Sequence, residues 1–175
     1  ITPSGKTKVF SGIETIGKLT VLGATLEEEG TYRLTSGERI GRKGVQVKIG
    51  EDWMPLEPGS PVAEGVETRE SQTATVADVY VTRGEATDGV LSSSIGRLAL
   101  QPVTHPNKID AEAGFRFRVM FDGEPLAGQQ IQVQREGGQY ESPAYSALVT
   151  SDADGYATFA MERPGAYLMM TRKSA

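Results

Sequence analysis

The feature of the sequence that most restricts its fold is a two-residue alternation over residues 115–121. Apolar side chains occupy every second position and two intervening positions hold arginine, in the order Phe115, Arg116, Phe117, Arg118, Val119, Met120, Phe121. Because successive side chains of a strand point to opposite faces, this pattern predicts a half-buried strand. The dipeptide Asp122-Gly123 that follows is typical of a tight turn.

Short runs of this kind, separated by turn signals, recur along the chain, whereas helical periodicity is scarce. Further strands are predicted at 8–10, 18–22, 32–34, 45–49, 75–82, 97–103, 130–134, 147–150, 156–161 and 166–171, and residues 53–56 form a short apolar run. Residues 57–73 carry prolines and glycines without a period, which predicts a linker or long loop. The run at 166–171 is apolar on both faces, as in a central strand of a sheet. The predicted fold class is therefore all-β, with the strands arranged as β-sandwiches.

A weak internal repeat bears on the domain organisation. Residues 28–34 and 163–169 both read as a turn, a glycine, a small residue, a tyrosine and an apolar strand. A glycine and a tyrosine in this order often open a late strand of immunoglobulin-like and transthyretin-like sandwiches. We therefore expect two small domains of this type: an N-terminal β domain over 1–97, with a long loop near 57–73, and a C-terminal β-sandwich over 98–175.

Composition excludes several classes of function. The chain has no cysteine, which removes disulfides, thiolate catalysis and cysteine-based metal centres. Its 18 basic and 23 acidic residues give a net charge of −5, which argues against nonspecific binding of nucleic acid. No run approaches the roughly 18 apolar residues of a membrane-spanning helix. We expect neither a nucleic-acid partner nor a membrane span.

His105 is the only histidine, and the prolines and asparagine around it predict a turn or loop. It would serve as a metal ligand or general base in one interpretation, and in another as a loop histidine hydrogen-bonded to backbone. A single imidazole forms a transition-metal site only when carboxylates or a partner chain complete it. The serines at 92–94 lack the glycines of a nucleophile elbow, so we do not expect an enzyme.

The segment Asp152-Ala153-Asp154-Gly155 is similar to the start of a calcium loop. An EF-hand needs a glutamate at position 12, where this chain has Arg163, so that motif is excluded. A smaller calcium site on Asp152 and Asp154 is one interpretation. The other is a β-turn in which the aspartates bond to local amides and the glycine takes a positive φ.

Several segments in a fixed order resemble one bacterial family. They are Leu-Gln-Pro-Val-Thr-His-Pro-Asn at 100–107, Phe-Arg-Phe at 115–117, Phe-Asp-Gly-Glu-Pro-Leu-Ala-Gly at 121–128, Thr-Ser-Asp-Ala-Asp-Gly at 150–155 and Pro-Gly-Ala-Tyr at 164–167. The chain is thereby similar to NikM-like periplasmic proteins of poorly defined function that are associated with nickel or cobalt uptake. The resemblance is good over about 98–171 and weaker over 1–97, and Val-Thr-His-Pro-Asn is its distinctive part.

This resemblance implies export to the periplasm, a two-part β architecture and a role in handling Ni²⁺ or Co²⁺. Members of the family usually carry a histidine followed by a tryptophan near the mature N-terminus, and this sequence does not open with such a pair. The metal role carried over from the family therefore rests on His105, with Asp110 or Glu112 as carboxylate ligands.

The function expected from these observations is that of a non-enzymatic periplasmic binding or accessory protein. It would capture a divalent ion weakly or dock to an envelope transport protein. One alternative is a structural or protein-interaction module that presents loops or strand edges. Another is a carbohydrate-binding module that uses Trp53 with Tyr32 or Tyr80, although these rings are equally suited to a core.

The alternatives differ in what the structure should contain. Metal capture predicts an exposed His105 beside carboxylates. Protein interaction predicts an unpaired strand edge or an exposed apolar patch. Carbohydrate binding predicts exposed aromatic rings that lie in one plane.

Overall fold

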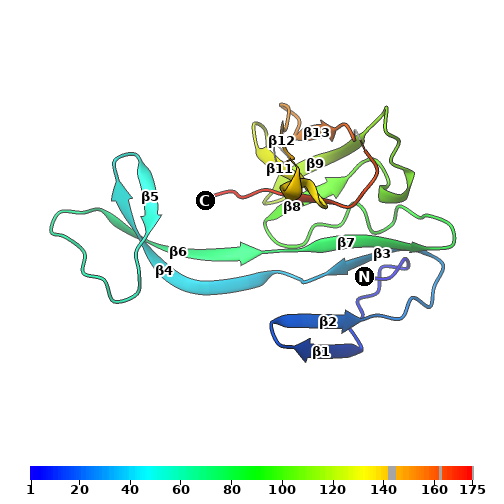
Figure 1. The fold of residues 1–175 in the computed structure, drawn as a ribbon, viewed down its shortest axis with the longest axis horizontal. Coiled ribbons are helices and arrows are strands. Elements are labelled where there is room, and N and C mark those ends of the chain that lie inside the picture. Colours follow the sequence, from blue (N-terminus) through cyan, green and yellow to red (C-terminus); the bar gives the residue numbers. More distant parts are fainter. Residues whose placement is uncertain (142–144, 162, 175) are drawn as a thin grey trace. The chain divides into compact units, whose positions relative to one another are not determined.

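The computed structural model describes residues 1–141, 145–161 and 163–174, and it confirms the predicted all-β class (Figure 1). The strands are β1 (Gly12–Ile16), β2 (Leu19–Gly23), β3 (Gly30–Thr35), β4 (Arg39–Ile49), β5 (Asp52–Pro55), β6 (Thr68–Thr75), β7 (Asp78–Arg83), β8 (Leu98–Pro102), β9 (Phe115–Phe121), β10 (Glu124–Pro125), β11 (Gln130–Arg135), β12 (Ser146–Thr150), β13 (Tyr156–Phe159) and β14 (Tyr167–Met170). Two short 3-10 helices accompany them, η1 (Pro106–Lys108) and η2 (Gly138–Tyr140).

The chain packs as two compact units. Residues 1–35 and 78–175 form the first, and residues 36–77 form the second. Strands β3 and β7 pair antiparallel within the first unit, and their last pair is Thr35 with Asp78. The second unit is therefore an insertion that leaves and re-enters the first at one point. The predicted boundary between residues 97 and 98 lies inside the first unit.

The core of the first unit lies between two antiparallel sheets. One sheet is β10-β9-β13 with β8 also paired to β9, and the other is β12-β11-β14. Both contribute to one buried apolar cluster, formed by Phe117, Val119, Ile131, Val133, Ala157 and Phe159. Burying a large apolar side chain stabilises a fold by about 1.5–3 kcal/mol, so this cluster is the main support of the sandwich. The alternation is confirmed over 115–119 and 130–134 as the inward and outward faces of β9 and β11. It fails at the end of β9, where Met120 on the arginine side is buried and Phe121 lies outside the core cluster.

The structure corrects the predicted place of the last strand. Strand β14 lies at the edge of its sheet, paired with β11 only in the described residues, and not at the centre. Its outward residues Leu168 and Met170 remain exposed beside the glutamines of β11. The prediction of a central strand was wrong because apolar residues on both faces of a strand do not require burial of both faces.

The second unit contains a three-stranded sheet in the order β5-β4-β6. Strand β6 begins at Thr68, so the loop predicted for 57–73 was wrong over its last part. The strand is polar apart from Ala74 and is held by antiparallel pairing with β4, for example Val47 opposite Thr68. The strand predicted for 8–10 is also absent from the described structure, where β1 begins at Gly12.

Candidate functional site

His105 lies at the start of η1 and is buried, with 6% of its surface exposed. Its Nδ1 accepts a hydrogen bond from the backbone N–H of Asn107 at 3.0 Å, and its Nε2 lies 2.9 Å from Oγ1 of Thr31. Because Nδ1 is an acceptor, we assign the neutral tautomer with the hydrogen on Nε2, which donates to Thr31. Both ring nitrogens are thereby used inside the fold.

Thr31 connects this histidine to the rest of the first unit. Its Oγ1 accepts from the backbone N–H of Thr87 at 3.0 Å and lies 3.0 Å from Oγ1 of Thr82. With His105 as the second donor, the Thr31 hydroxyl has its own hydrogen left for Thr82. The backbone N–H of Thr31 in turn donates to Oγ1 of Thr87 at 3.0 Å. The network joins β3, β7 and two loops, which favours the interpretation of His105 as a structural residue.

The carboxylates expected beside His105 lie in an exposed turn. Oδ1 of Asp110 accepts from the backbone N–H groups of Glu112 at 2.9 Å and Ala113 at 3.1 Å. Asp110 also forms an isolated bridge with Gly114. Within the ranges that the structure describes, no three histidine, aspartate or glutamate side chains gather in a way that would hold a metal ion. A metal site on His105, Asp110 and Glu112 stays a prediction that this geometry does not support.

Asp152 and Asp154 lie in the turn between β12 and β13. Oδ1 of Asp152 accepts from the backbone N–H groups of Asp154 at 3.0 Å and Tyr156 at 2.8 Å. Gly155 has a φ of 80°, and a Cβ there would lie 2.8 Å from the carbonyl oxygen of Val119. The contacts match the β-turn interpretation, with the Asp152 carboxylate holding the local backbone.

The aromatic residues considered for carbohydrate binding do not form an exposed platform. Tyr32 is buried, and its hydroxyl donates to the carbonyl of Glu28 at 2.9 Å. Trp53 is half-buried, with the Arg69 guanidinium carbon 4.3 Å from its ring centroid. The hydroxyl of Tyr80 is buried as well. None of the three presents a fully open ring face.

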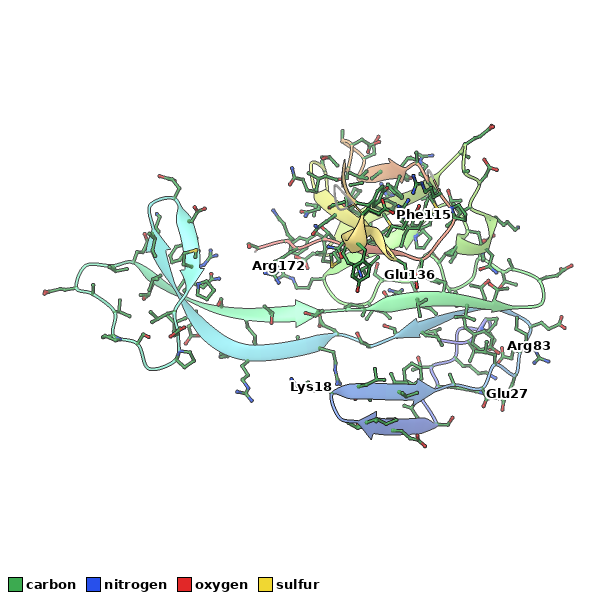
Figure 2. The ribbon with its side chains drawn as sticks, in the orientation of Figure 1. Lys18, Glu27, Arg83, Phe115, Glu136 and Arg172 are labelled. Carbon is green, nitrogen blue, oxygen red and sulfur yellow. The ribbon has the colours of Figure 1, made fainter. Side chains whose placement is uncertain are left out.

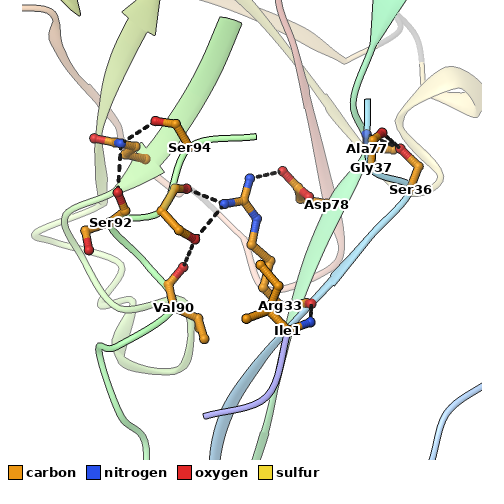
Figure 3. Close-up of polar contacts among 11 residues, drawn as sticks. Ile1, Arg33, Ser36, Gly37, Ala77, Asp78, Val90, Ser92 and Ser94 are labelled. Atoms are coloured by element: carbon orange, nitrogen blue, oxygen red, sulfur yellow. Dashed lines mark hydrogen bonds and ion pairs between the residues drawn. The ribbon is translucent and has the colours of Figure 1, made fainter. Parts of the chain in front are cut away.

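Arg33 is a buried cation that no motif in the sequence indicated. Its side chain is 1% exposed and forms an ion pair with Asp78 at 2.5 Å (Figure 3). Its Nη1 also donates to the carbonyl of Ser93 and, at 3.1 Å, to the hydroxyl of the same residue. Its place inside the strand predicted at 32–34 was the available signal, but no local pattern identified Asp78 as its partner. Arg33, Asp78 and Ser93 all belong to the first unit, so these contacts stabilise the fold of that unit.

Tyr80 lies beside this pair, and its hydroxyl has no hydrogen-bond partner among the described residues. The Arg33 guanidinium carbon is 5.9 Å from its ring centroid. Burial raises the pKa of the Tyr80 hydroxyl, and the nearby Arg33 charge opposes part of that rise. An unpartnered buried hydroxyl is a cost to the fold and not a support.

We therefore expect Tyr80→Phe to leave the free energy of unfolding at neutral pH unchanged or to raise it by up to about 1 kcal/mol. The unfolded chain releases the tyrosine proton first, near the ordinary pKa of about 10, so the wild type loses stability as the pH rises above it. Tyr80→Phe should lose less stability over that range. Urea unfolding at pH 7 and pH 11 measures both effects, and Tyr140→Phe, at an 87% exposed position, is the control. A clear loss of stability at pH 7 would show that the Tyr80 hydroxyl has a partner.

Hairpin β1–β2 exposes an unusual amount of apolar surface (Figure 2, where Lys18 marks its tip). Five side chains are between 48% and 67% exposed: Ile13, Ile16, Leu19, Val21 and Leu22. In the part of the chain that the structure describes, the two strands pair only with each other. The sequence predicted a strand at 18–22, but nothing in it showed that both faces would be exposed.

No helix in the described residues has the length and apolar character needed to cross a membrane. Neither a curated protein nor a solved structure gives a match. Residues 1–175 match a family described as a domain of unknown function, DUF4198. The chain therefore belongs to the DUF4198 family.

Proposed function

We propose that this protein is a non-enzymatic accessory protein of the bacterial envelope that docks to a transport protein through hairpin β1–β2. The observation that supports this is the exposed apolar surface of the hairpin, on a pair of strands with no further strand beside them. A two-stranded hairpin is marginally stable in water by itself, and exposed apolar patches are typical of interaction sites. A partner would supply the contacts that the hairpin lacks.

The edges of the hairpin define the kind of contact. Because β1 and β2 pair with each other only, each has an outer edge of unpaired backbone N–H and C=O groups in the described structure. An extended segment of the partner would add as a further strand, with backbone hydrogen bonds for affinity and side-chain contacts for specificity. The pair Ile16 and Leu19 next to the turn, together with Val21, would form the apolar contact on one face.

The envelope location and the link to nickel or cobalt uptake rest on the resemblance of residues 98–171 to NikM-like proteins. We propose that this link acts through docking to the transport protein and not through metal capture by His105. Both nitrogens of His105 are hydrogen-bonded, so a metal ion there would have to break one of these bonds. A structural or interaction module of the envelope would use the same hairpin surface.

The test compares two double variants of the hairpin. Ile16→Asp with Leu19→Asp places charge on the proposed contact face. Thr15→Asp with Thr20→Asp places the same charge on the other face, at positions that are also directly paired. In the complex, Ile16 and Leu19 would be buried against the partner. Losing both apolar contacts lowers the binding free energy by more than the roughly 1.4 kcal/mol that corresponds to a tenfold change in affinity. We expect the first variant to bind the partner at least about tenfold more weakly and the control to stay within about threefold.

The partner is first identified by photo-crosslinking in the native cell, from a benzoylphenylalanine placed at residue 19. The same residue placed at position 6, outside the hairpin, is the control. Affinities of the purified pair for the two double variants are then measured by calorimetry. Equal binding by both variants, or crosslinks that form equally from position 6, would contradict docking through the hairpin.

A further inference from the structure

The outer face of the sheet β8-β9-β13 carries two arginines beside one aromatic ring. The guanidinium carbons of Arg116 and Arg118 lie 4.3 Å and 4.8 Å from the ring centroid of Tyr156. In the antiparallel register, Arg118 is directly opposite Tyr156 and Arg116 is directly opposite Thr158. Directly paired and alternate residues share one face of a sheet, so these four side chains form one surface. We call it the Arg116–Arg118 face.

The two arginines leave most of their donors unused. Nε of Arg118 donates to the backbone carbonyl of Asp154 at 3.0 Å. Among the described residues, Arg116 makes no side-chain hydrogen bond and neither arginine forms an ion pair. Arg116 is exposed and Arg118 is half-buried, so both guanidinium groups can be reached from solvent. A chain of net charge −5 thus holds two adjacent cations without a carboxylate partner.

Arg97, immediately before β8, provides a comparison because it has a carboxylate partner. Its guanidinium carbon lies 4.7 Å from the ring centroid of Phe121, which is also on β9. Its Nε and Nη2 donate to the two carboxylate oxygens of Asp122 at 2.7 Å and 2.6 Å. An arginine lies over an aromatic ring at a similar distance in both places, but a carboxylate partner is present in only one of them.

Because Arg116 and Arg118 have no carboxylate partner in the described structure, a ligand that carries a carboxylate would complete their contacts. A guanidinium group presents paired N–H donors that match the two oxygens of a carboxylate. Contact with the Tyr156 ring limits the conformations of both arginines, which lowers the entropy that binding must overcome. The hydroxyls of Thr158 and Tyr156 make no hydrogen bond to the described protein, so they are free to bind hydroxyl groups.

We propose that the Arg116–Arg118 face binds an acidic saccharide of the uronate type. The carboxylate of the uronate lies between the two guanidinium groups, and its ring hydroxyls bond to Thr158 and Tyr156. An acidic peptide supplies carboxylates but not ring hydroxyls, so it would leave those two hydroxyls unused. The site lies in the first unit and is separate from hairpin β1–β2, so it does not depend on the function proposed above.

Two aspartates lie next to this surface, and their negative charges repel an anionic ligand. Asp152 and Asp154 are exposed in the turn that precedes β13, and the carbonyl of Asp154 is the acceptor for Arg118. Their carboxylates reduce the positive potential that an anion meets, although neither is ion-paired with the arginines within the described structure. Removing one of these charges should therefore strengthen binding.

Calorimetric titration at low ionic strength tests the proposal, with trigalacturonate as the probe. The neutral sugar galactotriose and the peptide triglutamate are the comparison ligands. We expect trigalacturonate to bind the wild type, and to bind Arg116→Gln with Arg118→Gln at least about tenfold more weakly. Arg97→Gln is the matched control, and its affinity should stay within about twofold. Binding to the wild type should weaken as salt is raised toward 0.5 M, because the arginines are near the surface.

Two further variants distinguish the loss of the binding site from the loss of the fold. Arg116→Lys keeps the charge but loses the paired donors, and should bind about threefold more weakly. Asp154→Asn should bind more tightly, which a damaged fold would not do. No binding by the wild type, or equal binding by the double arginine variant, would overturn the site. Triglutamate binding as tightly as trigalacturonate would overturn the saccharide assignment.

Discussion

Replacing Asp78 by alanine is expected to lower the free energy of unfolding by about 3–5 kcal/mol, because it leaves the buried Arg33 without its counter-charge. The Arg33 side chain is 1% exposed, and its other described hydrogen-bond partners are the carbonyl and hydroxyl of Ser93, which carry no charge. The Asp78 side chain is 21% exposed, so water reaches part of the pair and the lower end of the range is expected. Urea unfolding followed by circular dichroism gives the midpoint and the slope.

A double-mutant cycle separates the ion pair from its surroundings. Arg33→Met should cost less than Asp78→Ala, because it leaves a carboxylate that is partly solvated. Arg33→Met with Asp78→Leu replaces both charges by apolar groups and should recover most of the lost stability, to within about 1–2 kcal/mol of the wild type. A cost below about 1 kcal/mol for Asp78→Ala would mean that the Arg33 charge is compensated by other groups.

Replacing His105 by alanine is expected to lower the free energy of unfolding by about 2–3 kcal/mol. The change removes the bond from Nε2 to the fully buried Thr31 and leaves the N–H of Asn107, at the start of η1, without its acceptor. Asparagine places an oxygen near the position of Nδ1, and glutamine places a donor near the position of Nε2. His105→Asn should therefore keep the bond to Asn107, and His105→Gln the bond to Thr31, each at about half of the cost of alanine.

The same variants decide between the structural role of His105 and metal capture. Titration of the wild type with Ni²⁺, Co²⁺, Zn²⁺ and Ca²⁺ is compared with titration of His105→Asn, under conditions where both proteins are folded. We expect the two proteins to give the same result with every ion. Saturable Ni²⁺ or Co²⁺ binding that is lost in His105→Asn would make this residue a ligand. Ca²⁺ binding unchanged by the substitution would direct attention to Asp152 and Asp154.

The parts of the fold that were predictable are those where side-chain pattern and burial agree. In β9, Phe115 and Phe117 enter the core and Arg116 and Arg118 lie on the outer face, so the pattern alone predicted the strand and both faces of its first part. The pattern did not predict its last part, where Met120 is buried on the outer face. Strand β6 was not predictable, because its polar residues are held by backbone pairing with β4 and not by burial. Strand β14 was misplaced within its sheet, because Leu168 is apolar and yet 55% exposed.

The candidate sites depended on contacts between distant residues, which the sequence does not reveal locally. His105 was expected in a loop with hydrogen bonds to backbone, and its bond to Asn107 agrees with that interpretation. Its second partner, Thr31, is 74 positions away. The alternation at 115–121 already placed Arg116 and Arg118 together on one face. Only the register between β9 and β13 brought Tyr156 beside them.

The pairing of Thr35 with Asp78 has a consequence for how sequences of this family can differ in length. Residues 36–77 leave β3 after Thr35 and rejoin β7 at Asp78, and these two residues are directly opposite each other. The Cα atoms of opposite residues are about 5 Å apart, a gap that a two-residue turn spans. Residues between them can be lengthened, shortened or exchanged while the strands on either side keep their pairing. This junction is therefore a natural place for the gain, loss or grafting of a module.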